Sequence, residues 1–112
     1  MVPNPKFQLF KSAVNQQYYF RLRAKNGEII LSSEGYMSKQ NAQQGIKSVQ
    51  ANATIDAHYE LKDGLSNYTF NLKATNGEII GRSENYASAA ARQTGMASVK
   101  KNAPDAAVED LD

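Results

Sequence analysis

The sequence contains two copies of a segment about fifty residues long, arranged in tandem. A shift of fifty residues aligns Tyr18–Ala53 with Tyr68–Ala103, and 19 of the 36 aligned positions are identical. Self-similarity at one fixed shift indicates a duplicated structural unit. The chain is therefore constrained to fold as two similar units, with each structural element used twice.

Each copy is predicted to form a β-hairpin. Apolar residues alternate with other residues over 18–25 and again over 68–75, which is typical of a strand buried on one face. Asn26-Gly27 and Asn76-Gly77 follow, and this pair favours a two-residue type I′ turn with positive φ at both positions. The opposite pairs predicted for the first hairpin are Lys25–Glu28, Ala24–Ile29, Leu22–Leu31 and Phe20–Ser33.

A helix is predicted after each hairpin, because apolar residues recur there at helical spacing. Ser38 and Ser88 precede these segments and are good N-cap residues. Gly45 and Gly95 lie inside the predicted helices, where glycine costs about 1 kcal/mol relative to alanine. Close packing of each helix against the sheet is the simplest reason for keeping a glycine there.

Two further strands are predicted, at Ala57–Lys62 and Ala106–Leu111. Residues 7–9 match 59–61, so a related strand opens each copy. The segment 106–111 resembles such an opening strand but has no hairpin after it, so it has to pair with a strand from elsewhere in the chain.

The fold class is therefore α+β: two units forming one mainly antiparallel sheet, with two helices on one face. We expect residues 1–112 to form a single domain of two repeats, at about 6–56 and 57–112. One unit of this length buries too little surface to be stable by itself, so both units are expected to share one core.

Three motifs recur in both copies: Phe-x-Leu-x-Ala-x-Asn-Gly-Glu-Ile-Ile, Ser-Glu-x-Tyr-x-Ser and Gly-x-x-Ser-Val-x-x-Asn-Ala. They stand at Phe20–Ile30, Ser33–Ser38, Gly45–Ala53, Phe70–Ile80, Ser83–Ser88 and Gly95–Ala103. In this combination the chain resembles the YegP-like family of uncharacterised bacterial proteins. The resemblance implies two units that form one sheet and exchange their last strands. It brings no catalytic residue or cofactor to carry over.

Composition excludes several functions. The chain has no cysteine, which excludes disulfides, thiolate nucleophiles and cysteine-based zinc sites. The net charge is +2, from 13 basic and 11 acidic residues, whereas dedicated nucleic-acid-binding proteins usually concentrate more positive charge. No apolar run predicts a signal peptide or a membrane-spanning helix. We therefore expect a cytoplasmic protein.

No set of residues predicts catalysis. The only histidine is His58, which has no counterpart in the first copy and is expected near a strand end. Glu34 with Tyr36, and Glu84 with Tyr86, could be an acid and a phenol that transfer a proton. Their position just before the helices favours a structural role instead. No metal and no cofactor are expected.

The candidate binding site is the sheet face that points away from the helices. Arginines and aromatic residues on such a face can bind single-stranded nucleic acid, but an open antiparallel face is commonly only solvated. A protein or small-ligand contact is the third possibility. The residues predicted for this face are Phe10, Tyr19, Arg21, Arg23, Ile30, Lys73, Ile80 and Arg82.

These observations favour a small non-enzymatic binding or interaction module, with single-stranded nucleic-acid binding as the alternative. Its partners cannot be named from the sequence. The chain is expected to be a monomer, because the pairing of two units is satisfied within it.

Overall fold

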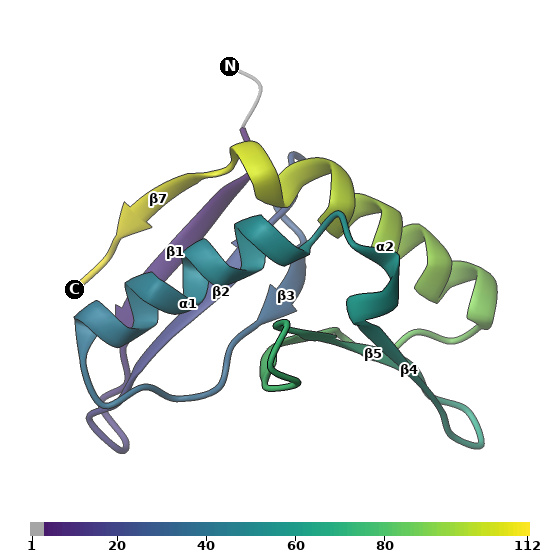
Figure 1. Cartoon of the computed structure of the whole chain (residues 1–112), viewed down its shortest axis with the longest axis horizontal. Helices are drawn as coiled ribbons and strands as arrows, with labels where there is room; N and C mark the ends of the chain where they lie inside the picture. Colours follow the sequence, from purple (N-terminus) through teal and green to yellow (C-terminus); the bar gives the residue numbers. More distant parts are fainter. Residues whose placement is uncertain (1–3) are drawn as a thin grey trace.

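The computed structural model describes residues 4–112, which form one sheet with two α-helices on the same face (Figure 1). The sheet has seven strands in the order β4-β5-β6-β3-β2-β1-β7. Neighbouring strands are antiparallel, except for β1 and β7, which are parallel. The α+β architecture with one mixed sheet is the one that the duplicated sequence predicts.

Each repeat contributes three strands and one α-helix, and the second repeat ends with an additional strand, β7. The elements are β1 (Lys6–Lys11), β2 (Tyr18–Arg23), β3 (Ile29–Ser32), α1 (Lys39–Asn52), the short 3-10 helix η1 (Asp56–His58), β4 (Tyr59–Asp63), β5 (Tyr68–Lys73), β6 (Ile79–Arg82), α2 (Ala89–Asn102), the short 3-10 helix η2 (Ala103–Asp105) and β7 (Ala107–Asp110).

The first hairpin has a three-residue loop at 25–27 instead of the predicted two-residue turn. Gly27 N donates to Ala24 O, and Ala24 N donates to Glu28 O, both at 2.9 Å. Gly27 has a φ of 85°, but Asn26 is not in the positive-φ region. This is a type I turn followed by a left-handed glycine. The prediction of positive φ at Asn26 is therefore wrong.

A bulge in β3 follows from this loop. Arg23, rather than Ala24, lies opposite Ile29, and the register shifts before Leu31. Ile30 is thus an extra residue in β3, and an extra residue interrupts the alternation of side chains between the two faces. Ile30 is 5% exposed and Leu31 is fully buried, so both belong to the core.

The second hairpin repeats both features. Gly77 has a φ of 87°, whereas Asn76 is not in the positive-φ region. Lys73 lies opposite Ile79 after the same register shift, and Ile80 is 6% exposed. The expectation that this isoleucine and Ile30 line the outer sheet face is therefore wrong.

Both helices begin at the predicted serines. Ser38 Oγ accepts a hydrogen bond from Asn41 N at 3.1 Å, and Ser88 Oγ accepts one from Ala91 N at 3.0 Å. Each bond satisfies a backbone N–H that has no partner within its helix.

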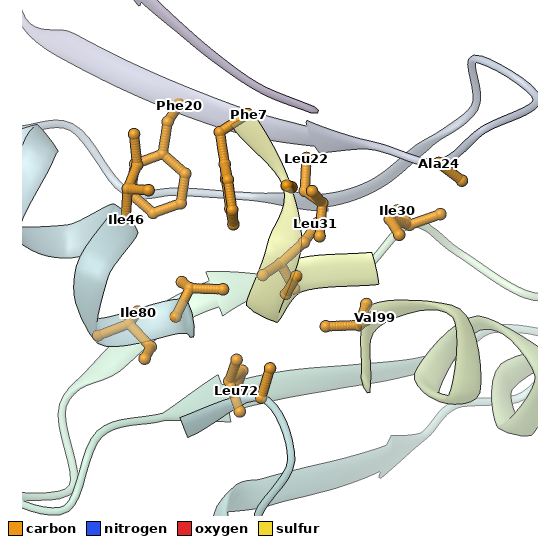
Figure 2. Close-up of a cluster of buried hydrophobic side chains, with 14 of the residues drawn as sticks. Phe7, Phe20, Leu22, Ala24, Ile30, Leu31, Ile46, Leu72, Ile80 and Val99 are labelled. Carbon is orange, nitrogen blue, oxygen red and sulfur yellow. The ribbon is translucent and has the colours of Figure 1, made fainter. Parts of the chain in front are cut away.

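The core lies between the sheet and the helices and is continuous through both repeats (Figure 2). Helix α1 contacts β1 and β2 and also β5 and β6, while α2 contacts β5 and β3. Each helix therefore covers strands of both repeats. The largest fully buried side chains are Phe7, Leu9, Phe20, Leu22, Leu31, Ile46, Val49, Phe70, Leu72 and Val99.

The two repeats join where β3 meets β6, with Ser32 opposite Arg82. Leu31 fills the space above Gly81, because a Cβ atom on residue 81 would lie 2.5 Å from Leu31 Cδ2. Residues 31 and 81 occupy equivalent positions in the two copies, so a leucine on one side of the junction requires a glycine on the other.

The last strand of the second repeat crosses to the first repeat. Strand β7 pairs in parallel with β1, from Lys6 opposite Ala107 to Leu9 opposite Asp110. Leu111 N also donates to Leu9 O at 2.8 Å. The segment 106–111 therefore pairs with the first unit, as predicted. The exchange runs in one direction, because the chain continues from α1 through η1 directly into β4.

Candidate binding face on the sheet

The sheet face away from the helices carries one continuous row of polar residues. Along the strands of each repeat, these residues alternate with core residues such as Phe7, Phe20 and Phe70, so they point to the opposite side. We call this side the outer face. From β7 to β4, the residues that lie opposite one another in register are Glu109, Gln8, Arg21, Ser32, Arg82, Asn71 and Glu60.

Two aromatic residues lie beside this row in the first repeat. The rings of Phe10 and Tyr19 are stacked, with centroids 5.9 Å apart and an interplanar angle of 19°. The guanidinium carbon of Arg21 is 4.7 Å from the Phe10 ring centroid. Tyr19 Oη accepts a hydrogen bond from Asn15 Nδ2 at 2.8 Å. The result is a cation on an aromatic pair, and all three side chains are partly exposed.

Gln8 holds the two arginines of β2. Its Oε1 accepts hydrogen bonds from Arg21 Nε at 2.8 Å and from Arg23 Nε at 2.7 Å. Its Nε2 donates to Glu109 Oε1 at 2.8 Å. Within residues 4–112, neither arginine forms an ion pair with a carboxylate. Both guanidinium charges are therefore fixed in direction by a neutral amide.

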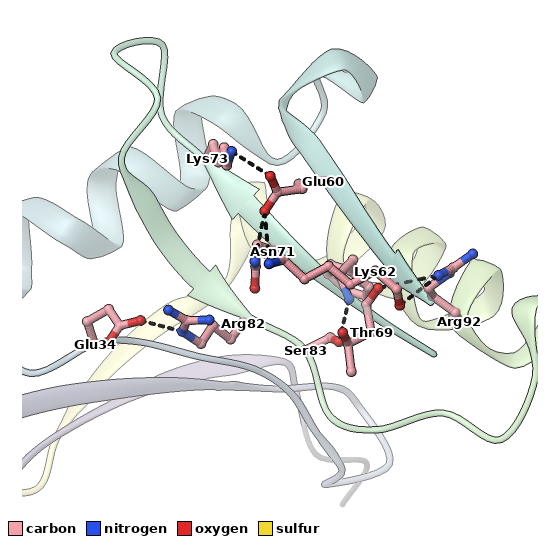
Figure 3. A network of polar contacts seen from close by, with 10 residues as sticks. Glu34, Glu60, Lys62, Thr69, Asn71, Lys73, Arg82, Ser83 and Arg92 are labelled. Atoms are coloured by element: carbon pink, nitrogen blue, oxygen red, sulfur yellow. Dashed lines mark hydrogen bonds and ion pairs between the residues drawn. The ribbon is translucent and has the colours of Figure 1, made fainter. Parts of the chain in front are cut away.

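At the equivalent place in the second repeat, a carboxylate neutralises the positive charge of Lys73. Glu60 occupies the position of Gln8, and it accepts hydrogen bonds from Lys73 Nζ at 2.8 Å and Asn71 Nδ2 at 3.1 Å (Figure 3). These two bonds hold the pKa of the Glu60 carboxyl below its usual value. Asn71 is 3% exposed, so this half of the outer face is closed by its own side chains.

On β2 and β5, the two halves agree at the positions that face the core and differ at those on the outer face. The inward pairs Tyr18/Tyr68, Phe20/Phe70 and Leu22/Leu72 are identical. The outward pairs all differ: Phe10/Lys62, Tyr19/Thr69, Arg21/Asn71 and Arg23/Lys73. These core-facing positions of β2 and β5 are preserved, and in the described chain only the first repeat combines outward aromatic rings with guanidinium groups outside any ion pair.

The structure divides the residues predicted for this face into three groups. Phe10, Tyr19, Arg21 and Arg23 lie together on β1 and β2. Lys73 and Arg82 are on the same face, but Lys73 is paired with Glu60 and Arg82 with Glu34. The two isoleucines at 30 and 80 are in the core.

Gln8 was not among the residues predicted from the sequence for this face. The feature that could have identified it is the alignment of residues 7–9 with 59–61, which places a neutral amide where the second copy has a carboxylate. Its role as a common acceptor depends on β1 lying beside β2 in the observed register.

Two other candidate groups, His58 and Glu34, have local structural partners. His58 Nδ1 lies 2.7 Å from Asn52 Oδ1. Burial, with a smaller contribution from Glu34, raises the pKa of the Tyr36 hydroxyl above its usual value, and Glu34 is paired with Arg82. No group of three metal-ligating side chains was found in residues 4–112. In the same part of the chain, no helix is both long and apolar enough to cross a membrane.

Comparison with known proteins identifies close relatives. UPF0339 protein YegP of Yersinia pestis is 56% identical over 57 residues, which are 51% of this chain and 51% of that protein. UPF0339 protein plu2779 of Photorhabdus laumondii is 48% identical over 56 residues, or 50% of this chain and 49% of the other. These alignments span about half the length of the curated relatives.

Solved structures also match over almost the whole chain. The solution NMR structure of yegP from E. coli, described as a protein of unknown function, has a TM-score of 0.90 and 45% identity. It covers 99% of this chain and 96% of that one. The solution NMR structure of a UPF0339 protein from Shewanella oneidensis also has a TM-score of 0.90, with 44% identity, and covers 96% and 92% of the two chains.

Both repeats match one family, for which no function is assigned. The match covers residues 13–60 and 66–110, and the family is described as a domain of unknown function (DUF1508). The resemblance to YegP-like proteins is thus confirmed in fold, repeat number and sequence. The chain belongs to the DUF1508 family, with one copy of the family's domain in each of its two repeats.

Proposed function

We propose that the protein is a non-enzymatic binding module that binds single-stranded nucleic acid on the outer face of its first repeat. One observation carries the proposal: Arg21 and Arg23 are held by Gln8 beside the stacked rings of Phe10 and Tyr19, and within residues 4–112 neither forms a direct ion pair with a carboxylate. Guanidinium groups bind phosphate, and aromatic rings stack on bases of any sequence.

The shape of the face supports this class of ligand. An extended strand needs an open surface along which its backbone can run, and no helix covers the outer face of the sheet. Two carboxylates beside this area, Glu34 and Glu109, are each paired with another cation, Arg82 and Lys6. An incoming phosphate would therefore approach Arg21 and Arg23 without first displacing an acidic side chain.

The test is fluorescence anisotropy with a labelled single-stranded oligonucleotide of about 12 nucleotides, a length within the range that single domains cover. Binding should weaken steeply as salt is added. Replacing Arg21 and Arg23 by alanine should weaken binding and reduce the slope of log K against log salt by about 0.7 for each phosphate that the variant no longer binds. The matched control is the double alanine variant of Lys47 and Lys101, two exposed helix lysines. It removes the same charge elsewhere.

A charge-neutral variant makes the test sharper. Exchanging two side chains, as Gln8→Glu with Glu109→Gln, keeps the net charge and both hydrogen-bonding groups. It moves the carboxylate to the position between Arg21 and Arg23, as Glu60 stands beside Lys73 in the second repeat. Binding should fall as in the double alanine variant. Equal affinity of all four proteins would contradict the proposal, and so would salt-independent binding, because it would show that the oligonucleotide phosphates do not contact these arginines.

We also propose that residues 1–112 act as one domain and as a monomer. Supporting this, strands of both repeats share one sheet and each helix packs on both repeats. Light scattering at micromolar concentration should give the mass of one chain, and a stable dimer would contradict this.

A further inference from the structure

The two edges of the sheet are equivalent in the duplicated sequence but different in the structure. Residues 7–9 of β1 correspond to residues 59–61 of β4. The edge of β1 that is turned away from β2 is covered by β7, which runs parallel to β1. The edge of β4 that is turned away from β5 is the end of the sheet, and no strand of the described chain lies there.

The difference is visible in one pair of leucines. Leu9 is fully buried, whereas its counterpart Leu61 is 50% exposed. Both point to the helix side of the sheet, because each alternates with a polar residue of the outer row. The position that β7 occupies on β1 is therefore an open, partly apolar position on β4.

The backbone of β4 is arranged to receive a strand. The backbone N–H and C=O of Tyr68 both pair with Tyr86, on the β6 side of β5. Because successive residues of a strand direct these groups to opposite edges, Asn71 directs its N–H and C=O toward β4. Asn71 lies opposite Glu60. Leu61, the residue after Glu60, therefore directs its N–H and C=O away from the sheet. Leu9 is equivalent, and its outward C=O accepts the bond from Leu111 N at 2.8 Å.

We propose that the outer edge of β4 is a docking site for an extended segment of a partner protein, added to the sheet as a strand parallel to β4. Strand addition of this kind uses backbone hydrogen bonds for affinity and alternate side chains for selectivity. The internal counterpart, β7 on β1, gives the direction and the register.

The side chains around this edge define the partner segment. On β7, Glu109 points to the outer face and bonds Gln8 and Lys6. The residue at the same place on β4 would meet Glu60, whose carboxylate already pairs with Lys73 at 2.8 Å and lies 3.9 Å from Lys62. A lysine or arginine there can share this partly exposed carboxylate, whereas a glutamate would place a second carboxylate beside it. Charge complementarity therefore predicts a basic residue at the position of the segment that points to the outer face.

The positions on the helix side should be apolar. Asp110 of β7 is paired with Lys39 at the start of α1, but Ala89 stands at the equivalent position of α2. The cations that α2 brings near β4, Arg92 and Lys100, are paired with Asp63 and Asp56. Without a lysine at position 89, and with Leu61 half exposed, an apolar side chain is favoured. The segment thus reads apolar, basic, apolar opposite residues 59, 60 and 61.

The same argument excludes β7 of a second copy as the occupant. Its Glu109 would face Glu60, and its Asp110 would lie beside Leu61 without a lysine partner. The acidic sequence of β7 suits β1 and opposes pairing with β4, which disfavours chains of this protein joining edge to edge.

The test uses isotope-labelled full-length protein and blocked synthetic peptides of about seven residues, the length of one short strand. The first peptide is Ser-Thr-Val-Lys-Val-Thr-Ser, and the second has glutamate in place of lysine. The third copies residues 106–111. The lysine peptide should shift the amide signals of residues 59–62 in a saturable way and slow hydrogen exchange at Leu61. The other two should bind at least about tenfold more weakly, because like charges would face each other.

Glu60→Gln is the matched variant, since the first repeat has glutamine at this position and folds normally around it. In this variant, the preference for the lysine peptide over the glutamate peptide should disappear. The proposal is overturned if millimolar lysine peptide gives no shifts, or if its shifts map to another surface. It is also overturned if wild-type protein binds the lysine and glutamate peptides equally well.

Discussion

Gly45 of α1 lies directly beneath the hydroxyl group of Tyr36, leaving no room for a Cβ atom between them. Tyr36 in turn stacks on Phe20 of β2, with ring centroids 6.1 Å apart. Gly95 and Tyr86 repeat the contact in the second half. The glycine predicted to allow close helix packing thus makes room for a tyrosine from the segment that leads into its helix.

Gly45→Ala should lower the free energy of unfolding by about 1–3 kcal/mol, the usual cost of forcing extra volume into a packed site. The loss should appear even though alanine has the higher helix propensity, by about 1 kcal/mol. Urea denaturation measures it. Adding Tyr36→Phe removes the nearest atom and should restore part of the loss. A Gly45→Ala protein as stable as wild type would show that the contact is not tight.

Gly27→Val should destabilise the protein by more than about 1 kcal/mol, because a β-branched residue resists positive φ. The space around residue 27 is open, so the effect would come from the backbone. Asn26→Ala should cost less, since it loses only the bond from Glu28 N to the asparagine Oδ1. Thermal denaturation compares the two variants. Equal losses would favour the two-residue turn, and an unchanged midpoint for Gly27→Val would refute either turn.

Deleting residues 105–112 should lower stability by roughly 1–3 kcal/mol, because the backbone groups of β1 lose their partners. The urea midpoint should fall, and amide exchange should accelerate in residues 7–10. Removing Asp112 by itself is the control, because it leaves the bond between Leu111 N and Leu9 O intact. Equal midpoints and unchanged exchange after the full deletion would mean that β7 contributes nothing to the sheet.

Acid should loosen β7 before the rest of the fold. Hydrogen bonding to Gln8, together with Lys6, lowers the pKa of Glu109, and the Asp112 backbone N–H and Lys39 lower the pKa of Asp110. A lowered carboxyl pKa contributes stability above the unfolded-state value of about 4, and this is lost as pH falls through the lowered pKa.

Amide signals of residues 107–111, followed from neutral pH to below about pH 4, measure this effect. The double variant Glu109→Gln with Asp110→Asn should remove most of the pH dependence in this segment. A segment that stays protected to the same pH as the core would contradict the prediction.

The sequence was sufficient to predict the duplicated fold, because inward residues such as Phe20 and Phe70 repeat at a fixed shift. The caps at Ser38 and Ser88 were also predictable, since N-capping depends on a few neighbouring residues. The pairing of β7 with the first unit was predictable because 106–111 aligns with an opening strand.

The loop type could not be predicted in the same way. Asn-Gly suits both a two-residue turn and a three-residue loop with a bulge, and the choice moves Ile30 from the outer face to the core. The candidate site was half predictable for a related reason. Alternation placed Arg21 and Arg23 on one face, but it could not show that Gln8 holds both, which requires the register of β1 on β2.

The pairing of β1 with β7 also has a consequence for protein synthesis. The partners Lys6 and Glu109 are 103 positions apart, so the ribosome makes β1 first among the strands and β7 last. A nascent chain that carries only the first repeat exposes β1 as a bare edge, and α1 then lacks β5 and β6 to cover. We therefore expect the first half of the chain to become stably folded only after the second half has been made, and to be prone to aggregation through β1 until then.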